Sequence, residues 1–475
     1  MNKSLKVLLI VPPERKPDKN RYTRRELGQE GVFPALGLAY IGAYLKEQGI
    51  QVSIIDSLAL GLTVDEVCAQ AAQEAADMIG VTVLTQQYTA SVRLAAALKK
   101  RLGDVPIVFG GIHIFAEHET VIRDVLDVDY CVRGEGERTM HELVKALAVG
   151  LDLSSIKGLT YRMDGRVTVN PERAFIENLD ELPYPARELL PMDAYRGTIA
   201  LDGGVPFSTI LATRGCPFSC QYCELATMWK TQRRRSVENV LDEIEHLKKT
   251  YGVKYLEFVD DLLVANKKWA IELCKGMCER GLDDIQWECC GRIGLMSEEL
   301  LVWMKKAGCR CVCYGIEFGS QRMLDFVNKK ITIRQIHETI EMTNRAGVPV
   351  KGLFMMGYPT ETKADIEETI GLARSLKLDY MAVSIVTPYP GTELYKYCVE
   401  KNLLTISDWN DYDIVQLRHR SVRLENLTLE ELVEYTDKIN RAFLLRPSYM
   451  MRMIWRHPKK ALGYGPKLLA RLLSL

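Results

Sequence analysis

Residues 213–224 read Thr-Arg-Gly-Cys-Pro-Phe-Ser-Cys-Gln-Tyr-Cys-Glu and place Cys216, Cys220 and Cys223 in a C-x3-C-x2-C array directly after a β-rich run, STILATR. Thiolate sulfur is a soft ligand that suits iron-sulfur clusters. A structural zinc site is the alternative, but it generally takes four ligands, and no further Cys or His lies close by in the sequence. Three cysteines leave one iron of a 4Fe-4S cluster without a protein ligand, so that iron can bind a small molecule.

The array opens a series of strand-like runs that alternate with helix-like segments. After STILATR the runs are YLEFVD, IQWECC, RCVCYGIEF, VKGLFMMG and YMAVSIV. Alternating strands and helices are typical of parallel sheets. The pattern predicts a partial (β/α)6 barrel over residues 206–395.

Upstream, residues 1–150 contain an earlier series of the same kind, with the runs LKVLLIV, QVSIID, MIGVTVL, PIVFGG and DYCVRG. Five strands with helices between them predict a doubly wound, Rossmann-like α/β domain that binds ligands beyond the carboxyl ends of its strands. Residues 151–205 form a predicted linker with a β-hairpin turned on Asp164-Gly165. Beyond that, residues 396–475 are expected to be a helical C-terminal region.

The overall composition is that of a globular protein. The chain has 475 residues, of which 47% are hydrophobic and 26% charged, and Lys plus Arg balance Asp plus Glu at 62 each. That balance gives no indication of nucleic-acid binding. No apolar run is long enough to suggest a membrane span or a signal peptide, so a cytoplasmic location is expected. Three of the 13 cysteines crowd into one short array, which favours metal binding over disulfides.

With Tyr222 before its last cysteine, the array resembles the signature of the radical S-adenosylmethionine (SAM) superfamily. The resemblance implies an oxygen-sensitive 4Fe-4S cluster on Cys216, Cys220 and Cys223, whose open iron binds SAM. In that family an electron from the cluster cleaves SAM to methionine and a 5'-deoxyadenosyl radical, which removes hydrogen from an unactivated carbon.

Further segments resemble SAM contacts of the same family. They are Tyr222 itself, Arg292 in the run of the third barrel strand, Glu317 at the end of the fourth, and Gly357 and Pro359 after the fifth. Some of them have a structural alternative. Glu317 could cap the next helix, and Gly357 and Pro359 could form a tight turn. Asp260 and Asp261 suit either acid/base work or a helix cap.

The N-terminal domain resembles cobalamin-binding domains of the methionine-synthase type, which carry D-x-H-x-x-G, then S-x-L, then a glycine pair. Matching residues follow successive strands. They are Asp56, Leu58, Gly61, Thr82, Leu84, Gly110, Gly111, His113, Gly134, Glu135 and Gly136. Leu58 departs from the pattern, because it stands where the family's histidine ligates cobalt. The resemblance therefore implies a corrin with an open or water-bound lower face. For His113 a helix-entry role is the alternative.

Two other features leave alternatives open. Cys289, Cys290, Cys311 and Cys313 could ligate a second cluster, although each lies in an apolar strand where a free cysteine behaves as a small hydrophobe. From Arg441 to Leu475 there are eight Lys or Arg and no Asp or Glu. This amphipathic tail predicts a helical cap, a contact with the inner membrane face or a lipid, or a partner-protein contact.

Together the two resemblances imply a cobalamin-dependent radical SAM enzyme that methylates an unactivated carbon. An anaerobic oxidative cyclase, as in the magnesium-protoporphyrin ester cyclase group, is a second hypothesis, and a non-catalytic cobalamin carrier or sensor is a third. The expected partners are a small-molecule substrate and an electron donor such as flavodoxin or ferredoxin. If the tail contacts a membrane, the substrate is expected to be a lipid or another hydrophobic molecule.

Overall fold

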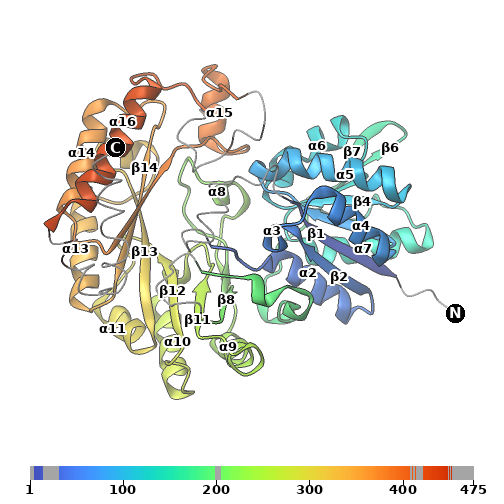
Figure 1. Ribbon diagram of the computed structural model, residues 1–475, viewed down its shortest axis with the longest axis horizontal. Coiled ribbons are helices and arrows are strands. Elements are labelled where there is room, and N and C mark those ends of the chain that lie inside the picture. The colour runs from blue at the N-terminus through green and yellow to red at the C-terminus, as the bar shows by residue number, and fades with distance from the viewer. Residues whose placement is uncertain are drawn as a thin grey trace.

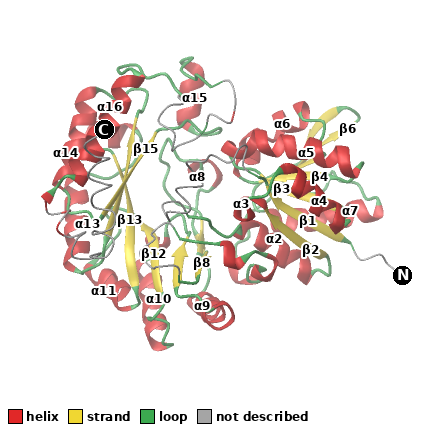
Figure 2. Cartoon of the chain, in the orientation of Figure 1, coloured by secondary structure: helices red, strands yellow, loops and turns green. Residues whose placement is uncertain are grey.

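The computed structural model describes residues 5–13, 31–197, 205–406, 409, 412, 421–447, 449 and 451. In Figure 1 the chain forms two α/β domains that lie side by side, and each is a layer built around its own sheet. The N-terminal residues belong to one and the C-terminal residues to the other. The strands of each sheet lie inside and the helices outside (Figure 2). The predicted α/β class is confirmed.

The first sheet has the strand order β2-β1-β3-β4-β5-β6-β7. Its first five strands are parallel, as a doubly wound fold requires. They are β1 (Lys6–Val11), β2 (Gln51–Asp56), β3 (Met78–Thr82), β4 (Ile107–Gly110) and β5 (Tyr130–Val132). The helices that follow them are α2 (Leu36–Glu47), α3 (Ser57–Leu60), α4 (Val64–Glu74), α5 (Tyr88–Leu102), α6 (Ile112–Asp124) and α7 (Gly136–Val149).

These helices cover both faces of the first sheet. Buried apolar side chains of α4, α5 and α6 pack with one set of strand residues. Side chains of α2 and α7 pack with the alternate set. Because successive strand side chains point to opposite faces, fully buried strands such as β1 need apolar residues at every position. The run Val7–Ile10 meets that need, with each side chain no more than 1% exposed.

The predicted hairpin forms on Asp164-Gly165, between β6 (Leu159–Met163) and β7 (Arg166–Val169). It does not stand apart from the first layer. Strand β6 pairs antiparallel with β5, so the hairpin extends the N-terminal sheet by two strands. The hairpin thus covers the edge that β5 would otherwise expose.

The second sheet has six parallel strands in the order β15-β14-β13-β12-β11-β8. They are β8 (Phe207–Ile210), β11 (Tyr255–Phe258), β12 (Gln286–Gly291), β13 (Cys309–Glu317), β14 (Val350–Met356) and β15 (Tyr380–Ile385). The helices that follow them are α9 (Val237–Tyr251), α10 (Lys267–Glu279), α11 (Glu298–Lys306), α12 (Gln321–Phe326), α13 (Ile333–Arg345) and α14 (Lys363–Ser375). The partial (β/α)6 barrel is confirmed.

The barrel sheet is packed on its outer face by a large apolar core that takes side chains from these helices. In β14 buried and partly exposed residues alternate strictly, so only one of its faces lies in that core. The other face lines the inside of the barrel. At the C-terminal end, α15 (Glu393–Glu400) and α16 (Leu429–Leu444) follow, and α16 packs beside α14.

Several helices begin with a reciprocal capping box, in which the N-cap threonine and the residue three positions on bind each other's backbone N–H. The pairs are Thr63 with Glu66, Thr332 with Gln335, Thr362 with Asp365, and Thr428 with Glu431. The described helices include none that is both long and apolar enough to cross a membrane.

Candidate functional site

The cysteine array lies in a loop at the carboxyl end of the barrel sheet. It follows β9 (Thr213–Arg214), which pairs with β10 (Arg233–Arg234), and it ends at the short helix α8 (Leu225–Met228). The thiols of Cys216, Cys220 and Cys223 are close enough to interact electrostatically. Burial raises the pKa of Cys223 to about 11. Three thiols that share one loop suit a cluster, which takes one thiolate per iron.

The start of this loop depends on Gly215. Its φ is +94°, and a Cβ at this position would lie 2.3 Å from the carbonyl oxygen of Thr231. A side chain therefore cannot be accommodated without moving the backbone. This close approach fixes where Cys216 begins the array.

Two aspartates that follow β11 hold the loop of residues 212–224, called the cluster loop because it carries the three cysteines. The carboxylate of Asp260 accepts hydrogen bonds from the backbone N–H groups of Ala212 and Thr213. That of Asp261 accepts one from Gly215 at 3.0 Å. Burial raises the pKa of Asp260 to about 7. Neither aspartate caps α10, whose N-cap is Asn266. The helix-cap alternative is wrong, and both carboxylates position the cluster loop.

Three of the predicted SAM residues converge beside the array. Glu317 ends β13 with a φ of +66°, and its carboxylate lies 2.7 Å from Nζ of Lys329. The same Nζ lies 3.2 Å from the hydroxyl of Tyr222. Lys329 therefore joins Glu317 to the cysteine loop. Glu317 does not cap α12, whose N-cap position is Ser320.

Arg292 is the third of these residues. Its Nη1 lies 3.9 Å from Sγ of Cys220, and its guanidinium lies 3.6 Å from the centre of the Phe218 ring. It also donates a hydrogen bond to the carbonyl of Lys329. The guanidinium is thus buried directly against the thiol loop, where its charge favours thiolate.

Gly357 and Pro359 form a tight turn after β14. The Glu361 carboxylate closes it by accepting the N–H of Gly357 at 2.6 Å and that of Tyr358 at 3.2 Å. Burial raises the pKa of Glu361 to about 8. The Tyr358 hydroxyl lies 3.4 Å from Gln221, within the array. The turn therefore packs beside the cluster loop, and the backbone carbonyl of Pro359 binds Glu425 in the C-terminal region.

At the carboxyl ends of the first sheet lies a cavity of about 310 Å³ that both layers line. Thr82, at the end of β3, contributes to it. So do the predicted cobalamin residues Gly110, Gly111, Gly134, Glu135 and Gly136. From the second layer come residues at the start of the cluster loop, namely Thr213, Arg214, Gly215 and Asp261.

The glycines give this cavity its room. A Cβ added at Gly134 would meet nothing within 4 Å, and one at Gly110 would meet only the carbonyl oxygen of Val132, at 3.8 Å. Side chains at these positions would occupy the space that a nucleotide tail needs. The residues present therefore fit the tail of a cobalamin.

The remaining predicted cobalamin residues lie outside the lining of this cavity. Asp56 caps α3 by accepting a hydrogen bond from the N–H of Ala59, and it also accepts one from the hydroxyl of Tyr195 at 2.8 Å. Leu58 packs partly buried against the core, and Gly61 ends α3 with a φ of +66°. Leu84, at 39% exposure, is open to solvent.

His113 is almost fully buried near the start of α6. Its Nδ1 lies 3.3 Å from the hydroxyl of Thr85, and its ring packs on Tyr88 and Trp409. Burial lowers its pKa to about 4, so the ring is neutral at physiological pH. The imidazole is thus engaged by neighbours from both layers.

Sequence reasoning missed two groups that tie this region together. One is Lys329, which lies outside any motif. The other is the link between layers, in which Glu135 binds both Arg214 and Arg233, while Glu137 binds Arg214 at 2.7 Å. The sequence signal for this link is the pair of acidic residues in Arg133-Gly-Glu-Gly-Glu137 together with the basic residues that flank the array.

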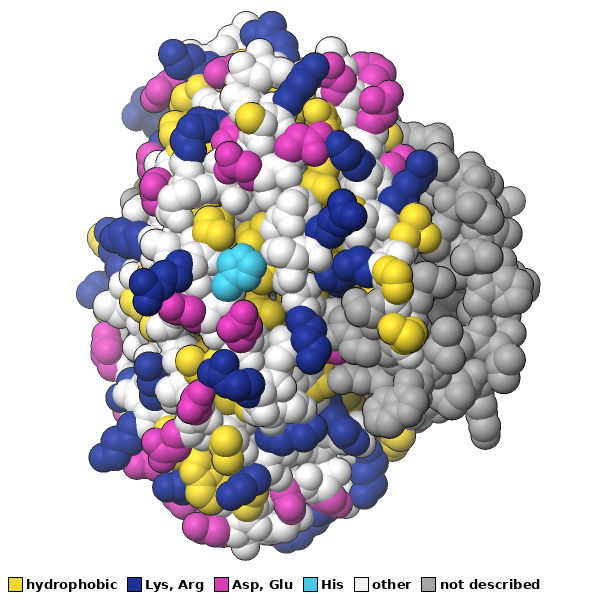
Figure 3. All heavy atoms as spheres, turned by 90° about the vertical axis from the view of Figure 1, so that its left-hand side faces the viewer, with side chains coloured by type: hydrophobic (Ala, Val, Ile, Leu, Met, Phe, Trp, Pro, Cys, Tyr) yellow, Lys and Arg dark blue, Asp and Glu magenta, His cyan; other side chains and the backbone are white. Residues whose placement is uncertain are grey.

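The predicted basic tail lies mostly outside the described residues, which end at residue 451. On the face over α13, α14 and α16, acidic and basic side chains are interspersed with scattered apolar ones (Figure 3). Among the described side chains of that face, no single charge is concentrated in a way that would suit nucleic acid.

Comparison with known proteins agrees with this arrangement. The B12 binding domain family matches residues 29–144, and the Radical SAM superfamily matches residues 210–373. An uncharacterised methyltransferase of Pyrococcus horikoshii is 36% identical over 456 residues, which cover 96% of each chain. The anaerobic magnesium-protoporphyrin IX monomethyl ester cyclase of Rubrivivax gelatinosus is 31% identical over 81% of this chain and 69% of its own.

Among solved structures, the radical SAM methyltransferase TsrM from Kitasatospora setae, with cobalamin and a 4Fe-4S cluster bound, superposes with a TM-score of 0.69. It is 18% identical, and the match covers 84% of this chain and 78% of that one. The likeness extends over both layers, and at this identity it concerns the fold. The two domain families confirm the expected pairing of a cobalamin domain with a radical SAM domain.

Proposed function

This chain belongs to the cobalamin-binding radical SAM family of enzymes, and we propose that within it the protein methylates an unactivated carbon of a small molecule. Methyl transfer is the activity named for the Pyrococcus relative, which matches this chain along nearly its whole length.

One observation carries the proposal. The cavity at the carboxyl ends of the first sheet is lined from the other side by Arg214 and Gly215, immediately before Cys216. A cofactor that rests on Gly110 and Gly134 is therefore a neighbour of the cluster loop. Methylation of an unactivated carbon needs a hydrogen-removing group and a methyl donor beside one substrate. Because residues of the cluster loop line the cavity, the two groups would lie close enough to act on the same substrate.

When bound, the cluster with SAM supplies the radical that removes hydrogen, and cobalamin supplies the methyl group. The chain's own residues hold and orient these groups. Cys216, Cys220 and Cys223 would ligate the cluster, with Asp260 and Asp261 fixing the loop through its backbone N–H groups. Tyr222, Arg292, Glu317, Gly357 and Pro359 would surround SAM.

Leu58 supports the same proposal from the cobalamin side. A leucine cannot ligate cobalt, and Asp56 is already engaged by Tyr195 and Ala59. A cobalamin held here would have no histidine ligand from position 58. Cobalamin bound without a ligand from Asp56 or Leu58 would supply methyl-transfer chemistry, which is what this proposal requires of it.

An oxidative cyclase is the second candidate. It is favoured by the relative from Rubrivivax gelatinosus, which is named as a cyclase and which this chain matches over more than two thirds of its length. The same cavity and loop would serve that reaction, but the product would gain no methyl group. A carrier or sensor without catalysis would have no use for the three clustered thiols.

The test is anaerobic reconstitution with iron, sulfide and cobalamin, followed by incubation with methyl-labelled SAM and a cell extract. Label in a product, together with 5'-deoxyadenosine, is expected. Product without label would overturn methylation in favour of cyclisation, and no 5'-deoxyadenosine would overturn both. Cys220→Ala should abolish both signals, whereas Cys278→Ala, a partly exposed cysteine of α10, should retain them.

The partners and location belong to the same proposal. Reduction of the cluster requires an electron donor such as flavodoxin or ferredoxin. We place the enzyme in the cytoplasm, with the basic tail as the segment that would meet a membrane surface or a hydrophobic substrate. Reduction by purified flavodoxin and sedimentation with anionic vesicles test these two points.

A further inference from the structure

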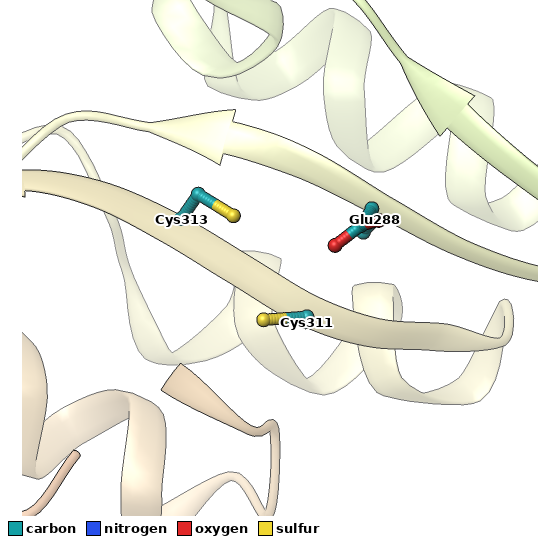
Figure 4. Close-up of side chains that lie close together, drawn as sticks. All are labelled: Glu288, Cys311 and Cys313. Carbon is teal, nitrogen blue, oxygen red and sulfur yellow. The ribbon is translucent and has the colours of Figure 1, made fainter. Parts of the chain in front are cut away.

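A second group of metal-binding side chains lies on the inner face of the barrel sheet. Glu288 projects from β12, and Cys311 and Cys313 project from the adjacent strand β13 (Figure 4). One carboxylate oxygen and the two sulfur atoms all lie within 4.8 Å of one another, and all three residues are buried. We propose that these three residues bind one zinc-class divalent metal ion, separate from the iron-sulfur cluster.

The strand pairing makes this grouping a fixed feature of the sheet. Glu288 and Cys311 are direct partners in the β12–β13 register, after a bulge that follows Trp287. Cys311 and Cys313 are two residues apart, so their side chains share a face. Zinc bonds to thiolate sulfur at about 2.3 Å and to carboxylate oxygen at about 2.0 to 2.2 Å. Small rotations of three side chains would therefore bring all three ligand atoms onto one ion.

The neighbouring charge indicates a divalent ion. Lys351 of β14 pairs with Cys313 in the strand register, and its ammonium interacts electrostatically with Cys313 and Glu288. Two thiolates and one carboxylate carry three negative charges. A divalent ion and Lys351 carry three positive charges and so offset the charges of the three ligands, and the carboxyl group of Glu257 also lies close to Glu288 and Lys351.

A further polar group adjoins this site without a partner among the described residues. The hydroxyl of Tyr255 is buried, with its side chain 3% exposed, and has no hydrogen-bond partner there. It lies close enough to Glu288 and Cys311 to interact electrostatically with both. A buried hydroxyl normally has a partner. A metal-bound water in the fourth position would supply one and would complete the tetrahedron that zinc prefers.

The site is distinct from the cluster loop. Arg292, which touches Cys220, lies just past the end of β12 and four residues beyond Glu288, which is about 13 Å along the chain at about 3.3 Å per residue. It is also distinct from Cys289 and Cys309, which pack in the apolar core on the outer face. Of the cysteines considered for a second cluster, the structure therefore puts Cys289 on the opposite face.

Metal analysis of the anaerobically purified full-length enzyme tests the proposal without measuring activity. About one zinc per chain is expected in addition to the iron of the cluster. Zinc-edge X-ray absorption should show two sulfur neighbours at about 2.3 Å, with nitrogen or oxygen for the rest. Cobalt substitution in a chain that carries Cys216→Ala, Cys220→Ala and Cys223→Ala should give the absorption bands of tetrahedral cobalt-thiolate.

Variants assign the ligands. Cys311→Ser with Cys313→Ser should remove the zinc and leave the cluster iron unchanged, and Glu288→Gln should weaken zinc retention against a chelator. Cys289→Ser is the matched control, because Cys289 directly follows Glu288 in β12 but points to the opposite face of the sheet. This variant should retain zinc. If the double variant does not fold, absorption on the unmodified enzyme still decides the ligand set.

Three results would overturn the proposal. The first is zinc content near zero after growth with zinc, and the second is zinc that survives in the folded double variant. The third is an iron content that corresponds to two clusters per chain and falls to one cluster when Cys311 and Cys313 are replaced. Each is independent of methyl transfer, so failure here leaves the proposed function untouched.

Discussion

The guanidinium of Arg214 lies 2.7 Å from the carboxylate of Glu135, and this contact joins β9 to the turn that follows β5 of the first sheet. Arg214 stands two positions before the first cysteine of the array, and Glu135 stands in the glycine-rich turn that lines the cavity. Both side chains are nearly buried. The contact therefore couples the position of the cluster loop to the position of the cobalamin domain.

Replacing Arg214 should destabilise this junction. Arg214→Ala leaves the buried carboxylate of Glu137 without its cation, and breaking a buried pair typically costs about 3 to 5 kcal/mol. Urea unfolding at neutral pH should record a loss of that order. Arg138→Ala, which breaks an exposed pair with Glu181, should cost about 0 to 1 kcal/mol. Equal losses in the two variants would contradict a structural role for the junction.

Lys329 should be required for SAM cleavage but not for cluster assembly. Lys329→Met removes the cation that Glu317 and Tyr222 share, leaving a buried carboxylate uncompensated beside the SAM region. We expect 5'-deoxyadenosine release to fall roughly a hundredfold, since a charge-assisted pair is worth about 1.5 to 3 kcal/mol. Iron content should stay unchanged. Lys330→Met, at the exposed neighbouring position, is the control. Loss of iron in Lys329→Met would assign the lysine to the fold of the loop instead.

Filling the cavity should displace cobalamin alone. Gly110→Leu puts a side chain into the cavity at a position whose backbone does not need a positive φ. Cobalamin affinity should fall by at least about tenfold, or about 1.4 kcal/mol, as measured by absorbance after gel filtration. Iron content and the melting temperature should change little. Gly371→Leu, on an open face of α14, should bind cobalamin normally. Normal binding in Gly110→Leu would place the nucleotide tail elsewhere.

Glu361 should make the stability of the barrel depend on pH. Burial raises the pKa of this carboxyl to about 8, above its ordinary value of 4.5. Between these pH values the folded chain holds a proton that the unfolded chain has lost. The stabilising contribution is therefore complete below about pH 4.5 and disappears as the pH rises to about 8.

Urea unfolding at pH 5.5 and pH 8.0 measures that dependence. Glu361→Gln, which cannot ionise, should lose less stability than the native chain over this interval, by a few kcal/mol. Glu367→Gln, which changes an exposed ion pair with Lys438, should behave as the native chain does. An identical pH slope in all three proteins would show that Glu361 titrates normally in the folded state.

Local patterns were enough to predict both sheets. The runs from Lys6 to Val132 and from Phe207 to Ile385 appear as strands in the expected order, because strand periodicity and helix caps are encoded within a few residues. The ends of those strands also located Arg292, Glu317 and Gly357 correctly on the barrel. The domain boundaries and the roles of the site residues stay predictions.

What the sequence could not supply were partners that lie far apart along the chain. Asp260 looked like a catalytic acid or a cap, because nothing local indicates that it binds backbone groups 47 and 48 positions earlier. Lys329 meets Tyr222 across 107 positions, and Tyr195 meets Asp56 across 139. Such pairs follow from how the elements pack in three dimensions, which one sequence without relatives does not reveal.

The hairpin of β6 and β7 has a consequence for how the protein behaves at high concentration. An open sheet edge exposes a row of backbone groups on which a second chain can add a strand. Here the outermost strand on that side, β7, has only four residues and begins with the exposed Arg166. A short edge strand with a charged residue disfavours the addition of a strand from a second chain. The hairpin therefore also protects the protein from aggregation through this edge of the sheet.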